Sequence, residues 1–219
     1  MARVLVLRPE PGASTTVERA RALQLDAIAH PLFEVSPVAW QAPELSSFDG
    51  LLLTSANALR HGGAGLEALR GLKAYAVGEA TAGLAREAGF DIAATGEAGV
   101  QRLLASIEPD LRLLHLCGAE RQDAGEVRQT IVPIVAYRSI AVDAGKLPKA
   151  DVVLVHSARA GERLAELAQD RPGMAVAAIS RGAADAVGDG WRAVEVADAP
   201  TDDALLALAA RLCNKPPPK

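Results

Sequence analysis

The stretch Asp49-Gly-Leu-Leu-Leu-Thr-Ser-Ala-Asn-Ala-Leu59 occurs a second time, as Asp151-Val-Val-Leu-Val-His-Ser-Ala-Arg-Ala-Gly161. Each copy is an acidic residue, a short apolar run, a Ser-Ala-x-Ala turn and the start of a helical pattern. A strand that leads into a helix in this way is the building unit of a parallel α/β sheet. The spacing of the two copies is far too long for a solenoid repeat, so we interpret the chain as two related halves.

A second pair of segments follows the first pair at the same separation in the sequence. Ala76-Val-Gly-Glu-Ala-Thr-Ala82 corresponds to Ala178-Ile-Ser-Arg-Gly-Ala-Ala184, and the pairs Gly89-Phe90 and Gly190-Trp191 then close the two units. The duplication therefore extends over more than one strand–helix unit in each half.

Strand-like and helix-like segments alternate around these repeats. We expect buried strands at residues 3–7, 27–29, 51–53, 74–77, 91–94, 111–116, 152–155, 176–179 and 193–196. We expect helices at 14–25, 55–59, 79–88, 100–106, 120–129, 157–168, 182–187 and 201–212, the first of them capped by Ser14, Thr15 or Thr16. Two stretches, 31–40 and 130–142, are predicted to be extended, the first because its prolines oppose a helix.

These elements predict an α/β fold with two flavodoxin- or Rossmann-like parallel-sheet domains joined by a two-stranded β linker. Neither the opening β-α-β segment nor the C-terminal segment is large enough alone, so together they form a discontinuous outer domain, residues 1–30 plus 143–212. Residues 31–47 and 130–142 are the linker, 48–129 the second domain and 213–219 a tail. Such a linker leaves a cleft between the domains, where ligands commonly bind, and permits hinge motion.

Composition excludes several classes of function. The 219 residues are half hydrophobic, only 3% aromatic, and carry a formal net charge of −4, which argues against a nucleic-acid partner. No signal peptide and no stretch of membrane-spanning length is found, so we expect a cytoplasmic protein without a membrane partner. Cys117 and Cys213 have no metal or redox spacing and are expected to be buried, reduced thiols.

Ligands of open parallel sheets bind beyond the carboxyl ends of the strands. The loops at those ends hold our candidate binding residues: Arg8, Pro9, Ser55, Ala56, Gly78, Thr81, Ser157, Ala158, Ser180 and Arg181. Most of these loops precede helices, whose N-termini bind carboxylates and phosphates. For each serine the alternative is simple N-capping, and for Arg181 it is a solvated charge.

Several familiar sites are missing from the sequence. No glycine-rich dinucleotide motif, phosphate loop or Gly-x-Ser-x-Gly elbow is present, and the four histidines have no metal-ligand spacing and are each interpreted as neutral or surface residues. The residues alone therefore indicate a clamp for a small anionic molecule that needs no cofactor.

Six segments, taken in order, extend the argument to a family: Leu7-Arg8-Pro9, Phe48-Asp-Gly-Leu-Leu-Leu-Thr-Ser-Ala-Asn-Ala58, Ala76-Val-Gly-Glu-Ala-Thr-Ala82, Ala136-Tyr-Arg138, Val155-His-Ser-Ala-Arg-Ala160 and Pro200-Thr-Asp-Asp-Ala-Leu-Leu206. Each segment alone is a weak signal, but their ordered combination, over nearly the whole chain, resembles the uroporphyrinogen-III synthase family.

The resemblance implies a cytosolic lyase of tetrapyrrole (haem) biosynthesis that uses no metal or organic cofactor. Its substrate is hydroxymethylbilane, a linear tetrapyrrole with acetate and propionate side chains. Its product is the cyclic uroporphyrinogen III, formed with inversion of ring D and loss of water. Helix N-termini, backbone amides and Arg8 would hold the carboxylates, and a monomer is the default expectation.

The resemblance also assigns roles to single residues. Tyr137 lies in the matching Ala136-Tyr-Arg138 segment and could donate a proton to the departing hydroxyl group; the alternative is a half-buried tyrosine without a catalytic role. Thr81 matches a family threonine and could bind a carboxylate, or it could bond its own helix backbone.

One segment departs from the family pattern. The second half of the family resembles Ile-Gly-x-Thr-Thr-Ala, whereas this chain has Ile179-Ser-Arg-Gly-Ala-Ala184, without the threonine hydroxyls. Either they are dispensable, or Ser180 and Arg181 replace them, or activity is reduced. The competing hypotheses are therefore a degenerate paralogue and a non-catalytic two-domain binding protein that closes on an anionic molecule.

Overall fold

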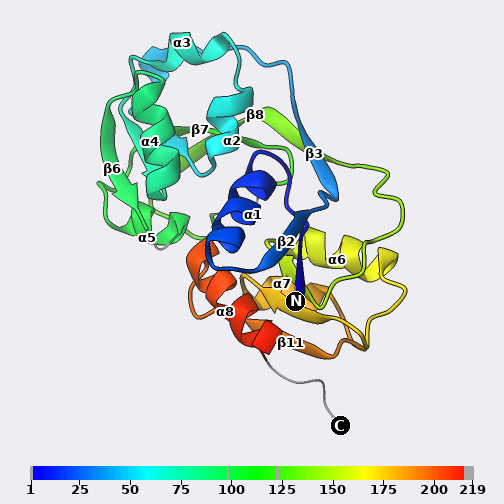
Figure 1. Ribbon diagram of the computed structural model, residues 1–219. Coiled ribbons are helices and arrows are strands. Elements are labelled where there is room, and N and C mark those ends of the chain that lie inside the picture. The colour runs from blue at the N-terminus through cyan, green and yellow to red at the C-terminus, as the bar shows by residue number, and fades with distance from the viewer. Residues whose placement is uncertain (1, 98, 122–123, 215–219) are drawn as a thin grey trace. The chain divides into compact units, whose positions relative to one another are not determined.

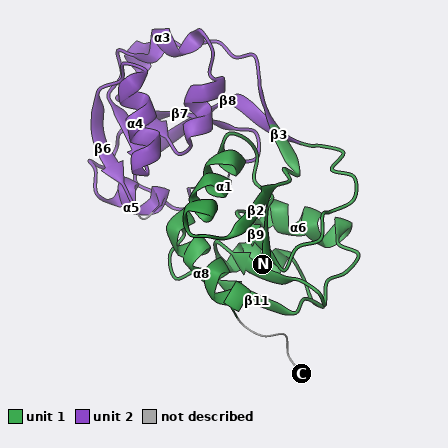
Figure 2. Cartoon of the chain, viewed as in Figure 1, with its two compact units in different colours: residues 1–34, 141–219 green, residues 35–140 purple. Residues whose placement is uncertain are grey.

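The computed structural model describes residues 2–97, 99–121 and 124–214, and the chain divides into two compact units. Unit 1 combines Met1–Glu34 with Ala141–Lys219, and unit 2 is the continuous segment Val35–Ile140 (Figure 2). Each unit has its own mostly parallel sheet and its own pair of hydrophobic cores.

Unit 1 contains a five-stranded sheet in the order β11-β10-β9-β1-β2, and its strands pair in parallel. The strands are β1 (Arg3–Val6), β2 (Asp26–Ala29), β9 (Val152–Val155), β10 (Ala175–Ala178) and β11 (Ala193–Val196). The two chain segments of unit 1 meet in this sheet, since Leu5 of β1 pairs with Val153 of β9. The short apolar runs of the sequence form strands because helices cover both faces of the sheet.

The helices of unit 1 are α1 (Gly12–Ala22), α6 (Ala158–Leu167), α7 (Arg181–Ala186) and α8 (Asp202–Asn214) (Figure 1). Alternate residues of β1 face opposite sides: Val4 packs in one core with Val17 of α1 and Leu208 of α8, whereas Leu5 packs in the other with Leu164 of α6. Unit 1 is thus a three-layer α/β/α structure.

Unit 2 contains a six-stranded sheet in the order β3-β8-β7-β4-β5-β6. Its strands are β3 (Phe33–Pro37), β4 (Gly50–Leu53), β5 (Ala74–Val77), β6 (Ile92–Gly96), β7 (Arg112–Gly118) and β8 (Thr130–Ala141). The helical segments are the 3₁₀ turn η1 (Leu45–Ser47), α2 (Ala56–His61), α3 (Gly65–Leu69), α4 (Glu79–Glu87) and α5 (Val100–Ala105). Helices α2, α3 and α4 contribute to one core of the sheet and α5 to the other.

The register between β7 and β8 slips at their carboxyl ends. Cys117 pairs with Val135 but Gly118 pairs with Tyr137, so Ala136 is an extra residue in β8. As a consequence the consecutive residues Ala136 and Tyr137 both pack against the core below α2, which an unbroken strand could not do. The bulge therefore turns the Tyr137 side chain toward α2.

The α/β class with two mostly parallel sheets is confirmed, and all nine predicted short strands are present within two residues of their predicted bounds. The exception to the parallel order is β3, which runs antiparallel to β8: the Val38 N–H donates to Ala136 O and the Val142 N–H to Leu32 O. Residues 130–142, assigned to the linker, contain β8, which pairs with β7 along the sheet of unit 2. Strand β3 crosses the unit boundary between Glu34 and Val35, and β8 crosses it between Ile140 and Ala141.

Some local predictions are wrong. The helix expected at 120–129 is absent from its described part, residues 120–121 and 124–129, where Gly125 takes a positive φ of 73°. Helix α1 begins at Gly12 rather than Ser14 and has no side-chain cap at its first position; instead the Glu10 carboxylate accepts from the Ser14 N–H at 3.0 Å. Helix α3 was not predicted.

The predicted tail at 213–219 divides in two. Cys213 and Asn214 belong to α8, while residues 215–219 lie outside the described residues. Within the described part of the chain, none of the helices combines the length and the apolar character needed to cross a membrane.

Candidate functional site

The candidate residues lie at the carboxyl ends of both sheets, and each unit is described by itself. In unit 1, Arg8 and Pro9 follow β1, Ser157 and Ala158 follow β9, and Ser180 and Arg181 follow β10. In unit 2, Ser55 and Ala56 follow β4, Gly78 and Thr81 follow β5, and Tyr137 lies in β8. These are the edges at which open α/β sheets bind ligands.

The three serines all act as N-caps. The hydroxyl oxygen of Ser55 accepts from the Asn57 N–H at 3.2 Å, that of Ser157 from Ala160 at 3.2 Å and that of Ser180 from Ala183 at 3.3 Å. The capping alternative is therefore realised at each serine. A hydroxyl that accepts one hydrogen bond keeps its proton for another acceptor, so capping does not use the whole group.

The capping role of Ser157 can be measured directly. Ser157→Ala removes the cap of α6, and we expect the free energy of unfolding to fall by about 1 kcal/mol in urea titrations. Ser157→Asn is the matched control, because asparagine caps helices equally well and should keep wild-type stability. An equal loss in both variants would contradict the capping role.

Two candidate residues of unit 2, Gly78 and Thr81, are distinguished by backbone conformation and by burial. Gly78 precedes α4 with a positive φ of 82°, a conformation that glycine adopts without strain. Thr81 lies in the first turn of α4 and is only 6% exposed, so most of its side chain packs within unit 2.

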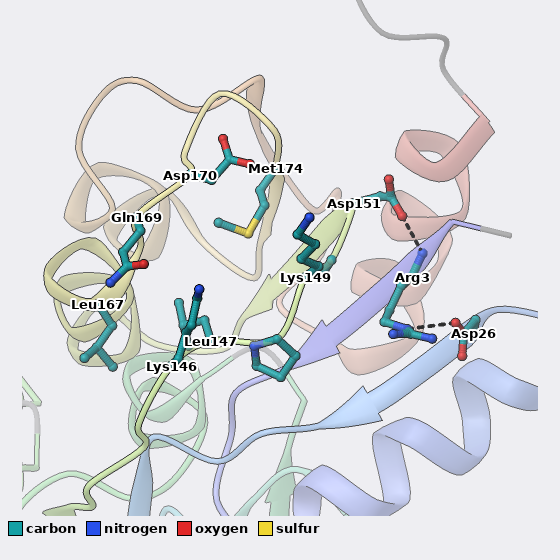
Figure 3. A pocket seen from close by; sticks show the side chains of 12 residues that line it. Arg3, Asp26, Lys146, Leu147, Lys149, Asp151, Leu167, Gln169, Asp170 and Met174 are labelled. Carbon is teal, nitrogen blue, oxygen red and sulfur yellow. Dashed lines mark hydrogen bonds and ion pairs between the residues drawn. The ribbon is translucent and has the colours of Figure 1, made fainter.

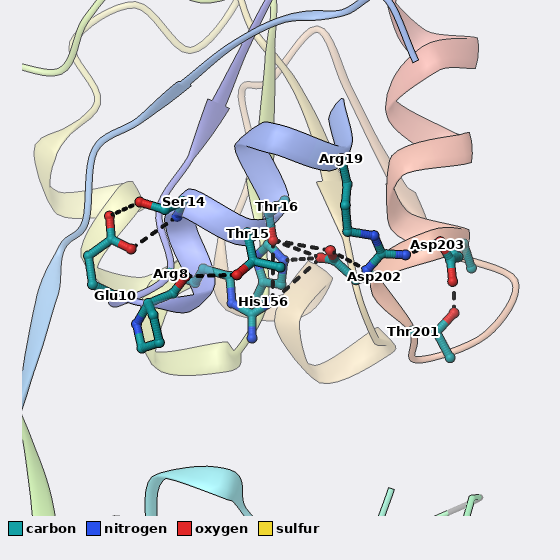
Figure 4. A network of polar contacts seen from close by, with 12 residues as sticks. Arg8, Glu10, Ser14, Thr15, Thr16, Arg19, His156, Thr201, Asp202 and Asp203 are labelled. Atoms are coloured by element: carbon teal, nitrogen blue, oxygen red, sulfur yellow. Dashed lines mark hydrogen bonds and ion pairs between the residues drawn. The ribbon is translucent and has the colours of Figure 1, made fainter. Parts of the chain in front are cut away.

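A polar network at the carboxyl edge of unit 1 surrounds Asp202, in the first turn of α8 (Figure 4). Its carboxylate accepts from the Thr16 hydroxyl at 3.1 Å to each oxygen, from Arg19 Nη1 at 2.9 Å and from His156 Nε2 at 3.0 Å. Arg8 Nη1 lies 3.5 Å from the same carboxylate and 3.3 Å from the Thr16 hydroxyl. One carboxylate thus joins the loop after β1, helix α1, the loop after β9 and helix α8.

The charge state of this network follows from its surroundings. Burial disfavours the charged carboxylate of Asp202, but the hydrogen bond from His156 and the nearby Arg8 hold its pKa below the usual value. Burial lowers the pKa of His156 in spite of its hydrogen bond to Asp202. At neutral pH we therefore assign an ionised Asp202 and a neutral His156 that carries its proton on Nε2, because a carboxylate can only accept.

The sequence did not identify this network. It treated His156 as neutral or on the surface and gave Asp202 no role in binding; the histidine side chain is 9% exposed and paired with Asp202. The signal that could have found them was the presence of both residues in segments that carry the family resemblance, Val155–Ala160 and Pro200–Leu206. Arg181, in contrast, is exposed on α7.

In unit 2, Tyr137 is half-buried beside α2. Burial raises the pKa of its phenol, while hydrogen bonds with the Ser55 hydroxyl and the Gly118 backbone act to lower it. The His61 ring lies 6.3 Å away between centroids. The ring rests against Gly118, where a Cβ would lie 2.7 Å from a ring carbon. Tyr137 is therefore protonated at neutral pH and held in place by its neighbours.

A second polar pair of unit 2 joins the loop after β4 to β7. Thr54 Oγ1, after β4, is 2.9 Å from Nε2 of His115 in β7. Burial, and secondly Arg121, lowers the pKa of His115 to about 4. Burial also raises the pKa of the Cys117 thiol. Both cysteines are free thiols, but only Cys117 is buried as predicted, since Cys213 is partly exposed.

Two cavities are lined by residues other than the candidate residues. One of about 480 Å³ is lined in unit 1 by Arg3, Asp26, Asp151 and Met174, at the amino ends of β1, β2 and β9 (Figure 3). It opens on the edge opposite to the candidate residues. Another, of about 630 Å³, is lined in unit 2 by His115, Arg121 and residues of 124–133. Among the residues that the structure describes, no three His, Cys, Asp or Glu side chains are grouped to hold a metal ion.

Two mostly parallel sheets with polar side chains at the carboxyl ends of their parallel strands define an α/β protein of the class that binds small molecules at this edge. The family model described as uroporphyrinogen-III synthase HemD matches residues 14–207. The chain therefore belongs to the uroporphyrinogen-III synthase family, whose members act in tetrapyrrole synthesis.

Solved structures with the same fold agree with this assignment. Uroporphyrinogen-III synthetase from Helicobacter pylori is 16% identical, with a TM-score of 0.63 over 97% of this chain and 100% of its own. A mutant uroporphyrinogen III synthase from Thermus thermophilus is 20% identical, with a TM-score of 0.58 over 98% of this chain and 100% of its own. A search of curated proteins gave no significant match.

Proposed function

We propose that this chain cyclises hydroxymethylbilane to uroporphyrinogen III, with inversion of ring D and loss of water. Family membership over residues 14–207 supports the reaction. One structural observation indicates which group acts in the reaction. It is the Tyr137 phenol, which is protonated and hydrogen-bonded at the carboxyl edge of the unit 2 sheet. We further propose that the enzyme is a hydro-lyase and that it acts in the cytoplasm as a monomer. Strands β3 and β8 form the linker between its two domains in this proposal.

The chemical step needs little from side chains. As the C–O bond of the hydroxymethyl group breaks, its electron pair leaves with the oxygen, and a proton from Tyr137 makes the leaving group water. The pyrrole nitrogen then stabilises the resulting azafulvene cation by conjugation. The cationic carbon first bonds to the substituted α-carbon of ring D and gives a spiro intermediate. The bond between that α-carbon and the carbon that bridges it to ring C then breaks, and the bridging carbon bonds to the other α-carbon of ring D, so that ring D is inverted. This second α-carbon loses its proton, and Tyr137 is reprotonated from solution.

Orientation is the larger part of catalysis in this proposal. Without an enzyme the linear tetrapyrrole closes to the symmetrical isomer I, so the protein must hold the substrate in a conformation that favours isomer III. We propose that Arg8, Pro9, Ser157, Ala158, Ser180 and Arg181 in unit 1, and Ser55, Ala56, Gly78 and Thr81 in unit 2, contact the substrate. Because the chain carries a net charge of −4, these local donors rather than a global field must attract the carboxylates.

The altered segment Ile179–Ala184 bears on the alternatives. The hydroxyl oxygen of Ser180 accepts the hydrogen bond that caps α7, and the Arg181 side chain is exposed. We propose that Arg181 contributes a carboxylate contact in place of the missing threonine hydroxyls. The loss of those hydroxyls is also the observation that favours a degenerate paralogue, which would bind the substrate without turnover.

A product assay separates these functions. Freshly prepared hydroxymethylbilane is supplied with and without the protein, the products are oxidised, and the uroporphyrin isomers are separated chromatographically. Predominantly isomer III supports the synthase. Isomer I alone, formed at the spontaneous rate by folded protein, would leave the binding protein or the paralogue as the function.

Within the same assay, Tyr137→Phe should slow isomer III formation by roughly tenfold, the cost of losing one hydrogen bond to the departing group. Substrate binding should change little, since the ring is kept. Tyr75→Phe is the matched control, because Tyr75 is buried in the other core of the same sheet. Unchanged turnover in Tyr137→Phe would remove this residue from the mechanism.

A further inference from the structure

We propose that Asp202 is a positioning residue for substrate binding, which holds the Arg8 guanidinium at the carboxyl edge of the unit 1 sheet to receive a substrate carboxylate. The inference rests on the proposed function, in which Arg8 binds such a carboxylate. Asp202 itself does not touch the substrate in this proposal; it acts through Arg8.

One nitrogen of Arg8 is bound between two groups that also bind each other. Arg8 Nη1 donates to the Thr16 hydroxyl at 3.3 Å and lies 3.5 Å from the Asp202 carboxylate, while Thr16 donates to both Asp202 oxygens at 3.1 Å. Thr16 is fully buried, and the Asp202 side chain is 13% exposed. The Arg8 side chain remains 35% exposed, so a ligand can reach it.

The opposite side of the guanidinium lies on Gly12, the first residue of α1. A Cβ at Gly12 would be 2.5 Å from Arg8 Nε and 2.8 Å from Cζ, so only glycine leaves room for the guanidinium there. This location is electrostatically unfavourable for a cation, because the N-terminus of an 11-residue helix carries partial positive charge. The negative charge of Asp202 offsets that repulsion, which explains why Arg8 stays at this position.

The remaining partners of Asp202 make it a rigid support. Arg19 of α1 donates at 2.9 Å and His156 after β9 donates at 3.0 Å, so both carboxylate oxygens are hydrogen-bonded from several elements. Because these hydrogen bonds fix the Asp202 carboxylate, its position determines where Arg8 Nη1 lies. The chemistry at this edge then suits the acetate and propionate groups of a linear tetrapyrrole.

A purely structural ion network is the competing explanation, and the chain offers a matched control. Asp203, the next residue, also pairs with Arg19 but is 86% exposed, whereas Arg8 and His156 contact the carboxylate of Asp202. Asp203→Asn therefore removes a neighbouring negative charge that also pairs with Arg19, but it leaves the contact between Asp202 and Arg8 intact.

The test is a double-mutant cycle between Asp202→Asn and Arg8→Gln, with KM and kcat for hydroxymethylbilane and urea unfolding as readouts. We expect each single variant to raise KM roughly tenfold, the size of one lost hydrogen bond to a charged group, with kcat within about twofold. The double variant should be no worse in KM than Arg8→Gln alone. Asp203→Asn should keep the wild-type KM.

A second variant covers the case in which Asp202→Asn does not fold. Gly12→Ala displaces Arg8 without altering Asp202 and should raise KM by a similar factor. Effects on KM that multiply in the double variant, or a change in unfolding alone, would overturn the role of Asp202. If wild type forms no isomer III, the proposed function itself fails; if wild type is active and only Arg8→Gln raises KM, the function stands and the inference about Asp202 falls.

Discussion

Gly118→Ala is expected to lower the rate of isomer III formation by roughly tenfold, as much as Tyr137→Phe, because displacing the Tyr137 phenol removes the same hydrogen bond to the departing group. The new methyl group would lie 2.7 Å from one ring carbon of Tyr137 and 2.8 Å from another, closer than real Cβ contacts allow. The ring must then leave its place beside Ser55. The backbone of β8 cannot move away to make room, because Tyr137 follows the bulge at Ala136 and pairs directly with Gly118. The measurement is the rate of isomer III formation.

Two further variants make this result specific. Gly83→Ala, in helix α4, adds a methyl group where no atom lies within 4 Å and should keep wild-type activity. Combining Gly118→Ala with Tyr137→Phe should give no slower rate than Gly118→Ala alone if the glycine acts through the tyrosine. Wild-type activity in Gly118→Ala would show that the position of Tyr137 is unimportant for turnover.

Unit 2 should lose up to about 3 kcal/mol of unfolding free energy between pH 7 and pH 4 through one residue, His115. Burial lowers its pKa to about 4 in the folded state, against an ordinary value of 6.5. Between these values the unfolded chain binds a proton that the folded chain does not, so stability falls as the pH falls through this window.

The measurement can be confined to unit 2. Of the two tryptophans, Trp40 lies in unit 2 and Trp191 in unit 1, so a Trp191→Phe background leaves Trp40 fluorescence to report on unit 2. His115→Gln does not titrate and can keep a hydrogen bond to Thr54, so the decrease should shrink strongly. Thr54→Val is the control, because it removes the partner but leaves the titrating group. An unchanged decrease in His115→Gln would place the pH dependence on other groups.

The fold was largely predictable because most of its information is local. Short apolar runs such as Val152–Val155 are fully buried strands, and the serine after each repeated strand marks the start of a helix. The helix expected at 120–129 failed because that segment has good helix formers but few apolar residues to bury, and propensity alone is a weak signal.

The site was less predictable because its geometry depends on distant residues. Asp202 binds Thr16, Arg19 and His156, which lie far from it in sequence, so no local pattern reveals the network. The bulge at Ala136 likewise depends on pairing with β7 and leaves no mark in the alternation of β8. The sequence could identify Tyr137 and Arg8 through a family resemblance, but not the groups that hold them.

The order of the strands has a consequence for synthesis of the chain. Strand β1 lies between β2 and β9, yet β9 begins at Val152, after all of unit 2 has been translated. Unit 2 is continuous and can fold as soon as it leaves the ribosome, whereas β1, α1 and β2 must wait with their apolar faces uncovered. Nascent chains that stop before Val152 should therefore contain a folded unit 2 and an N-terminal segment that chaperones bind.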